Sequence, residues 1–169
     1  MNLEHYSILY SSVTGNTKLL ADTIRAALPE EKCDYFGPCD GAEARSDLVY
    51  VGFWTDKGNA DAAALALLTA LRNKKLFLFG TAGFGGSEAY FSKVLGRVRE
   101  SIDASNTIVG EYMCQGKMPL SVRQRYESMK QQPNAAPNLD ALIANFDRAL
   151  ARPNEQDLAA LRQLVSQSR

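Results

Sequence analysis

Short apolar runs alternate with longer amphipathic segments over most of the chain, and this alternation constrains the fold more than any other feature. Five runs have the length and composition of buried strands: residues 6–10, 33–36, 48–53, 76–79 and 107–113. Helical periodicity predicts helices over residues 17–28, over residues 60–71 with Asn59 as the capping residue, and over about residues 87–104. Strands and helices in this order predict a parallel sheet that is covered by helices on both faces.

The remainder of the chain has only helical patterns. A polar linker at residues 131–137 precedes predicted helices at about residues 139–150 and 156–166. We expect residues 1–169 to form a single domain, with a core at about 5–118 and a helical extension at about 119–169. The extension contains an apolar helical stripe, formed by Leu139, Leu142, Ile143, Phe146 and Leu150. Because such a stripe is costly to leave in water, we expect the extension to pack on the sheet; an arm that binds a partner is the alternative.

Composition and charge argue against several classes of protein. The 169 residues include 19 lysines and arginines and 19 acids, whereas a protein that binds nucleic acid normally has a basic excess. No apolar run approaches the roughly 18 residues of a membrane span, so we expect no membrane insertion. The amino terminus has no signal-peptide pattern, and the three cysteines fit no zinc spacing. We therefore expect a cytoplasmic protein with reduced thiols and no metal site.

The loop after the first predicted strand is the strongest indication of a binding site. In open parallel sheets, ligands bind at the carboxyl ends of the strands. Residues 11–17 are uncharged and place four hydroxyl side chains around Gly15, immediately before a helix. Backbone N–H groups and the dipole at the start of a helix attract anions, and hydroxyls add hydrogen-bond donors. This loop therefore predicts a phosphate site; a plain helix cap is the alternative.

The loops after the third and fourth predicted strands add an aromatic side chain and a run of glycines. Trp54 is the only tryptophan, and its flat ring could stack on a planar ligand; a place in the core is the alternative. Residues 80–87 are rich in glycine, which lets a ligand approach the backbone, and Phe84 or Tyr90 could cover the ligand's second face. The run mimics a Walker A motif without its lysine, so it gives poor support for an NTPase.

The segment Ser12-Val13-Thr14-Gly15-Asn16-Thr17 resembles the flavodoxin phosphate loop, [Ser/Thr]-x-Thr-Gly-x-Thr, and follows the first strand as that loop does. The resemblance implies a flavodoxin-like three-layer α/β sandwich, a five-stranded parallel sheet of order 2-1-3-4-5, and one non-covalent FMN. Flavodoxins are themselves an example of the strand-end rule, so the two arguments are not independent. The implied cofactor contacts are Ser12, Val13, Thr14, Gly15, Asn16, Thr17, Trp54, Thr55, Asp56, Lys57, Gly58, Thr81, Ala82, Gly83, Phe84, Gly85 and Tyr90.

After the fifth strand, Cys114-Gln115-Gly116-Lys117-Met118 is similar to a segment in a bacterial subgroup of flavodoxin-like proteins, some of which accompany other reductases. The resemblance implies an FMN-binding electron-transfer protein that serves a reductase, with a redox partner protein as electron donor or acceptor. An FMN-dependent reductase that uses NAD(P)H directly is the alternative, and an interaction module that has lost FMN is a third. The chain is neutral where flavodoxins are strongly acidic, which argues against the basic partner surfaces that flavodoxins use. No general acid, base or nucleophile is evident, and Cys114 is predicted to be a buried thiol.

Overall fold

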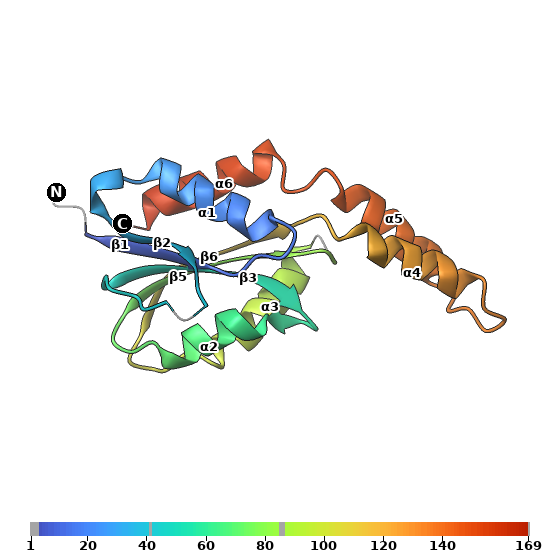
Figure 1. Cartoon of the computed structure of the whole chain (residues 1–169), viewed down its shortest axis with the longest axis horizontal. Coiled ribbons are helices and arrows are strands. Elements are labelled where there is room, and N and C mark those ends of the chain that lie inside the picture. The colour runs from blue at the N-terminus through green and yellow to red at the C-terminus, as the bar shows by residue number, and fades with distance from the viewer. Residues whose placement is uncertain (1–3, 41, 85–86, 169) are drawn as a thin grey trace.

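Five parallel strands form the central sheet of the computed structural model, which describes residues 4–40, 42–84 and 87–168. They are β1 (Tyr6–Tyr10), β2 (Cys33–Pro38), β3 (Leu48–Asp56), β5 (Lys75–Ala82) and β6 (Thr107–Gln115). Their order across the sheet is β2-β1-β3-β5-β6 (Figure 1). This order confirms the predicted 2-1-3-4-5 arrangement and the flavodoxin-like α/β fold, because the only difference in numbering comes from the short strand β4 (Asn59–Ala60), which pairs antiparallel with β3.

Helices cover both faces of this sheet. Helices α1 (Asn16–Ala27) and α6 (Glu155–Gln167) lie on one face, and α2 (Ala62–Ala70) and α3 (Glu88–Arg99) lie on the other (Figure 1). A buried apolar cluster on the first face includes Leu20, Ile24, Leu161 and Val165 of these helices. The cluster on the second face includes Ala64, Leu68, Val94 and Val98. The sheet is therefore buried on both sides, as its continuous apolar strands predict.

The predicted cap at Asn59 is wrong. Asn59 pairs with Asp56 in the β3–β4 hairpin, and α2 starts later, after Asp61. The Asp61 carboxylate accepts hydrogen bonds from the backbone N–H of Ala64 and of Trp54, so it caps the helix and holds the hairpin at once. Both residue types are good caps, and the pairing of the hairpin decides between them.

Glycine and phenylalanine alternate between the two central strands. In the β3–β5 register, Gly52 lies beside Phe79 and Phe53 lies beside Gly80. A Cβ atom on Gly52 would come within 2.4 Å of the Phe79 ring, and one on Gly80 within 2.3 Å of the Phe53 ring. Each glycine therefore provides the space that its neighbour's ring occupies, on opposite faces of the sheet.

Helices α4 (Leu120–Lys130) and α5 (Leu139–Ala149) form a hairpin that projects from the sandwich beyond the carboxyl ends of the strands (Figure 1). The two helices pack on each other, and their buried aromatic and aliphatic side chains, Tyr126, Leu139 and Phe146, belong to neither of the two clusters of the sandwich. The expectation that the extension packs on the sheet is therefore wrong for α5 and correct for α6. The apolar stripe of α5 packs on α4 instead of the sheet, with Leu139 and Phe146 buried, while Leu150 at the end of the stripe stays 52% exposed.

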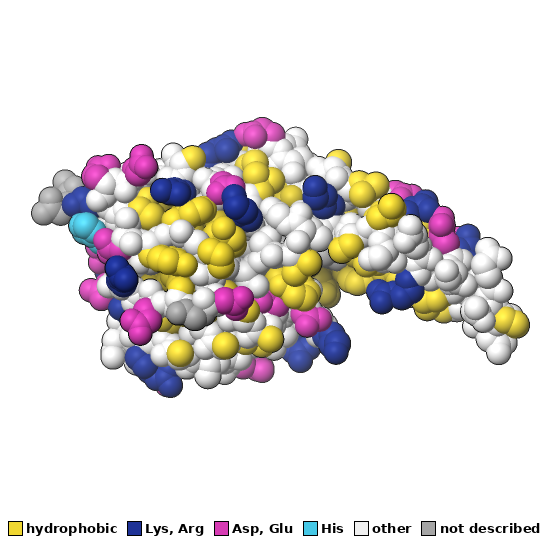
Figure 2. Space-filling view, viewed as in Figure 1, with side chains coloured by type: hydrophobic (Ala, Val, Ile, Leu, Met, Phe, Trp, Pro, Cys, Tyr) yellow, Lys and Arg dark blue, Asp and Glu magenta, His cyan; other side chains and the backbone are white. Residues whose placement is uncertain are grey.

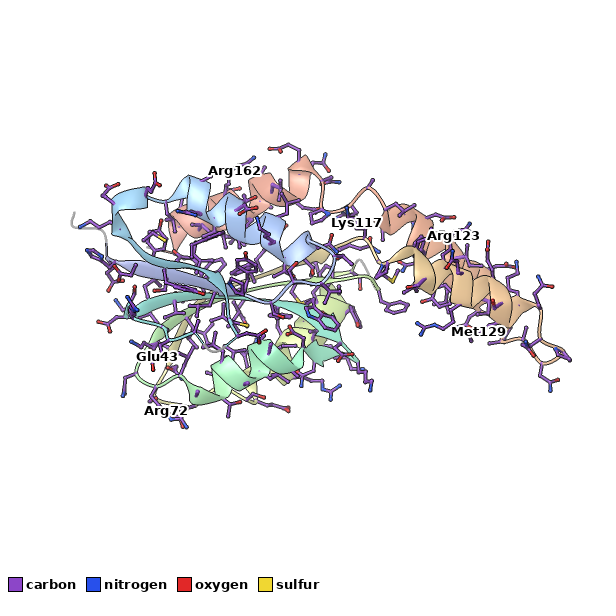
Figure 3. The ribbon with its side chains drawn as sticks, in the orientation of Figure 1. Glu43, Arg72, Lys117, Arg123, Met129 and Arg162 are labelled. Atoms are coloured by element: carbon purple, nitrogen blue, oxygen red, sulfur yellow. The ribbon has the colours of Figure 1, made fainter. Side chains whose placement is uncertain are left out.

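The arm, residues 118–151, leaves and rejoins the sandwich at one point. The backbone N–H of Lys117 donates a 3.0 Å hydrogen bond to the carbonyl oxygen of Arg152, so the two ends of the arm are adjacent. Figure 3 places Lys117 at this junction. No helix in the described part of the chain is long and apolar enough to cross a bilayer.

Candidate functional site

A cleft of about 320 Å³ opens at the carboxyl ends of β1, β3, β5 and β6, beside the base of the arm. The loops after all four strands contribute to its walls, and α4 closes one side. Its lining consists of Ser12, Val13, Thr14, Asn16, Thr17, Trp54, Thr55, Asp56, Lys57, Thr81, Ala82, Gly83, Phe84, Lys117, Met118, Pro119, Val122 and Arg125. The volume lies at the lower end of the range for small-molecule sites.

The start of α1 forms the polar end of this cleft. Gly15 caps the helix with a left-handed backbone, φ 89°, and offers no side chain to the helix N-terminus. The first turn carries no acidic residue, and Ser12 Oγ accepts from the N–H of Lys18 at 3.3 Å. Within the described residues, the N–H groups of Asn16 and Thr17 have no assigned acceptor. An anion is the natural partner for such a helix end.

Two of the polar side chains in this segment are engaged elsewhere. Thr17 Oγ1 donates to the carbonyl of Phe53 at 3.0 Å and lies 3.1 Å from Thr81 Oγ1, so this hydroxyl ties α1 to β3 and β5. Asn16 Nδ2 donates to the carbonyl of Lys117 at 2.7 Å. Ser12 and Thr14 are thus the hydroxyls left at the cleft, since the contact of Thr14 Oγ1 with the Lys117 carbonyl is long, at 3.4 Å.

The β3–β4 turn forms the second wall. Both of its central residues have left-handed backbones, with φ 52° at Lys57 and φ 78° at Gly58. This geometry is that of a type I′ hairpin turn, which matches the twist of the strands. Trp54 precedes the turn and is only partly buried, which places its ring at the cleft and not in the core. The Lys57 carbonyl accepts a long hydrogen bond, 3.4 Å, from Arg97 of α3.

The segment after β6 joins the remaining walls. Gln115 Nε2 donates to the carbonyl of Gly83 and to Asn145 Oδ1 of α5, both at 3.0 Å. Asn145 Nδ2 also donates to the Gly83 carbonyl, at 2.9 Å. Met118 packs so closely on Gly83 that a Cβ atom there would lie 2.4 Å from Met118 Cγ. The segment Cys114-Gln115-Gly116-Lys117-Met118 therefore connects the α1 loop, the β5 loop and the arm.

Most of the residues expected at the site line this one cleft. Gly15 lines a neighbouring cavity between α1 and the end of the arm, Gly58 lies in the turn outside the lining, and Gly85 lies outside the described residues. Tyr90 is also outside the lining and packs beside Phe91, with ring centroids 6.3 Å apart. Phe84 is the aromatic side chain of that loop at the cleft. The lining residues that the sequence did not identify as contacts are Lys117, Met118, Pro119, Val122 and Arg125.

The charges around the cleft are mainly positive. Its described lining contains three cationic side chains, Lys57, Lys117 and Arg125, and a single carboxylate, Asp56. All four are exposed, and no ion pair joins any of them to a described residue. No histidine, cysteine or glutamate is part of that lining, and no cluster of three or more metal-ligating side chains occurs in the described ranges.

The two buried cysteines are expected to be poor nucleophiles. Burial raises the pKa of Cys39 to about 11 and the pKa of Cys114 to about 12, which confirms that Cys114 is a buried thiol. At pH 8 we expect iodoacetamide to alkylate both at least about 100-fold more slowly in the native protein than in urea, because the thiolate is the reactive form. Peptide mass spectrometry of a time course measures this, and rapid native labelling of Cys114 would contradict it.

This chain belongs to the flavodoxin domain family, whose model matches residues 7–166. The match includes the arm and α6 as well as the five-stranded body. The flavodoxin-like domain-containing protein BilS of Clostridium symbiosum is 36% identical to this chain over an alignment of 180 positions. The alignment covers 96% of this chain and 95% of that protein.

Solved structures show the same fold at low sequence identity. A short-chain flavodoxin associated with a PDU bacterial microcompartment has a TM-score of 0.61 and 14% identity, with 97% of this chain and 95% of that chain covered. A flavoprotein from Lactobacillus acidophilus NCFM, solved in complex with FMN, has a TM-score of 0.50 and 16% identity, with 66% and 94% covered.

Proposed function

We propose that the cleft binds one FMN non-covalently and that the protein carries electrons to or from a separate reductase. The observation that carries this proposal is the start of α1, where two N–H groups without an assigned acceptor and the hydroxyls of Ser12 and Thr14 meet at a cleft. This donor set suits a phosphate, which an uncharged loop can hold through backbone groups and the helix dipole. The family membership and the FMN of the Lactobacillus flavoprotein support the choice of a flavin phosphate.

The rest of the cleft fits the planar part of FMN. Trp54 offers a partly exposed flat ring on which a planar ligand could stack, and Thr81 and Ala82 at the end of β5 line the same cleft. When bound, FMN would supply the redox chemistry, and the chain would bind it and set its electrostatic surroundings. Because the described lining offers only Asp56 as a possible proton acceptor, and in an exposed position, electron transfer suits the cleft better than a reaction that needs a buried acid or base.

The test is a titration of the purified protein with FMN, followed by anaerobic reduction. We expect one FMN per chain in the visible spectrum and by calorimetry, reduction by dithionite, and no turnover with NADH or NADPH alone. The absence of a spectral shift and of binding heat with micromolar FMN would contradict the proposal. Multiple turnovers driven by NAD(P)H without a second protein would also contradict the proposal. They would mean that the protein is an FMN-dependent reductase that acts on its own substrate.

A further inference from the structure

We propose that the rim of the cleft and the adjoining face of α4 form the docking surface for a redox partner protein. The surface of this partner would present carboxylates around an apolar centre. This inference rests on the proposed function, because it states where that partner binds and with what chemistry. The docking surface consists of Val13, Phe84, Val122, Arg125 and Met129, together with the cationic side chains of the cleft rim.

The apolar part of the docking surface comes from two sides. Val13 and Phe84 are lining residues of the cleft and yet 66% and 42% exposed. Opposite them, Val122 and Arg125 line the cleft from α4, and Met129 follows one turn later on the same helix face, 42% exposed. Large exposed hydrophobic side chains that gather in one place indicate an interaction site. Figure 2 shows hydrophobic and basic side chains together where the arm leaves the body.

The two sides of α4 differ in charge. Arg123 is ion-paired with Glu127 and with Asp147 of α5, and Lys130 is ion-paired with Asp140. Arg123 and Met129 lie on different sides of the helix (Figure 3). The positive charges of Arg123 and Lys130 are therefore paired with acids of the hairpin. Arg125 has no ion-pair partner among the described residues, so its charge is not neutralised in this way.

The rim of the cleft continues this positive charge. Lys57 extends from the β3–β4 turn and Lys117 from the base of the arm, against the single carboxylate of Asp56. Exposed charges of one sign guide an oppositely charged protein to the surface and raise its association rate. They also oppose a second copy of this chain, because a two-fold contact would place the same cations opposite each other. A partner with carboxylates is therefore the occupant that the charges favour.

The arm is held at the cleft by polar contacts that keep this surface in one shape. Asn145 and Gln115 share the carbonyl of Gly83 and bond to each other, which ties α5 to the loop that carries Phe84. Because α4 packs on α5, its outward face is fixed relative to the cleft. A partner on this face would lie directly beside the proposed flavin site, as electron transfer requires.

The experiment compares two reference acceptors of opposite charge. FMN-loaded protein, reduced with dithionite, is mixed in a stopped-flow instrument with an acidic rubredoxin or with the basic mitochondrial cytochrome c. In each encounter one electron leaves the reduced flavin and converts the ferric iron of the acceptor to ferrous iron. We expect the rate with rubredoxin to fall at least about tenfold between 0.05 and 0.5 M NaCl, and the rate with cytochrome c to stay level or rise.

Three variants, each with one side chain replaced by glutamine, show which residues determine the rate of electron transfer to rubredoxin. Arg125→Gln is expected to lower the rubredoxin rate at low salt by about three- to tenfold and to have little effect at high salt. Met129→Gln should lower it at both salt concentrations. Arg148→Gln is the control, because Arg148 is an exposed arginine of α5 that has no described ion pair and is not part of the cleft lining; its rate should equal that of the wild type.

The outcomes separate the docking surface from the proposed function. A rate with cytochrome c that falls with added salt, a rate with rubredoxin that does not fall, or equal effects of Arg125→Gln and Arg148→Gln, overturns the docking surface while leaving FMN binding intact. A dimer in sedimentation experiments that Met129→Gln dissociates would assign the surface to a second copy and also overturn it. If no FMN binds, the proposed function fails, and docking is judged by NMR titration with rubredoxin. Chemical-shift changes confined to α4 and the cleft rim would support the docking surface, and the absence of such changes would overturn it.

Discussion

FMN is expected to bind this protein about 100- to 10,000-fold more tightly than riboflavin. The two ligands differ only in the phosphate, which the proposed site at the start of α1 would hold. A hydrogen bond to a charged group contributes about 1.5–3 kcal/mol, so two of them give about 3–6 kcal/mol. Without the phosphate, the N–H groups and hydroxyls of this loop remain unpaired in the complex. Calorimetric titration of the apoprotein with each flavin gives the ratio directly.

A substitution at Thr14 links that ratio to the loop. Thr14→Val keeps the volume of the side chain and removes the hydroxyl donor, and we expect it to weaken FMN binding by about ten- to 100-fold. Riboflavin binding should change little, so the ratio between the two ligands narrows. Thr69→Val, on α2 and away from the cleft, is the matched control, because its hydroxyl bonds only within its own helix. Equal FMN affinity of folded Thr14→Val and wild-type protein would mean that the loop serves only as a helix cap.

The second large effect is expected in the centre of the sheet. Gly52→Ala should lower the free energy of unfolding by about 3 kcal/mol, since its Cβ atom would lie 2.4 Å from the Phe79 ring and 2.9 Å from the methyl group of Thr17. A buried ring between two helices and a sheet has little room to move. Because Thr17 lies in the first turn of α1, beside the proposed phosphate site, the same variant should also weaken FMN binding. Urea denaturation measures the loss of stability as a lower midpoint at an unchanged slope.

Two further variants test the packing explanation. Gly52→Ala combined with Phe79→Leu should recover part of the stability, because the smaller side chain returns space to the new methyl group. Gly96→Ala in α3 should instead stabilise the protein slightly, since a Cβ atom added there would meet nothing within 4 Å and alanine favours a helix by about 1 kcal/mol. A double variant that is no more stable than Gly52→Ala alone would mean that the ring is not the obstacle.

The sequence predicts the sheet well because its signals are local. Continuous apolar runs and the intervening periodicity depend on neighbours along the chain, and all five strands lie where these patterns place them. The loop of the proposed phosphate site is equally local, since a glycine between hydroxyl residues directly precedes a helix. The left-handed backbone of Lys57 is less predictable: a turn between paired strands requires it, whereas the sequence alone assigns such a conformation only to Gly58.

The rest of the site depends on contacts between distant segments. Val122 and Arg125 reach the cleft because α4 starts at the base of the arm, and no periodicity in α4 itself reveals that position. The stripe of α5 is a real apolar face, but a stripe does not specify its partner, and α4 competes successfully with the sheet. Thr17 looks like a phosphate donor in sequence, yet Phe53 and Thr81 take its hydroxyl once the strands assemble.

The bond between the Lys117 N–H and the Arg152 carbonyl makes the arm an excisable module. Because the chain leaves and re-enters the body within one hydrogen bond, a linker of about two or three glycines could join the two sides with little closure entropy. The shortened protein would retain the body that the α1 loop and the β3–β4 turn belong to, while giving up one wall of the cleft. If the proposed docking surface recruits the partner, exchange of the hairpin for one of different surface chemistry would change the partner and, through Val122 and Arg125, one wall of the cleft as well, so that a single replaceable segment would set both.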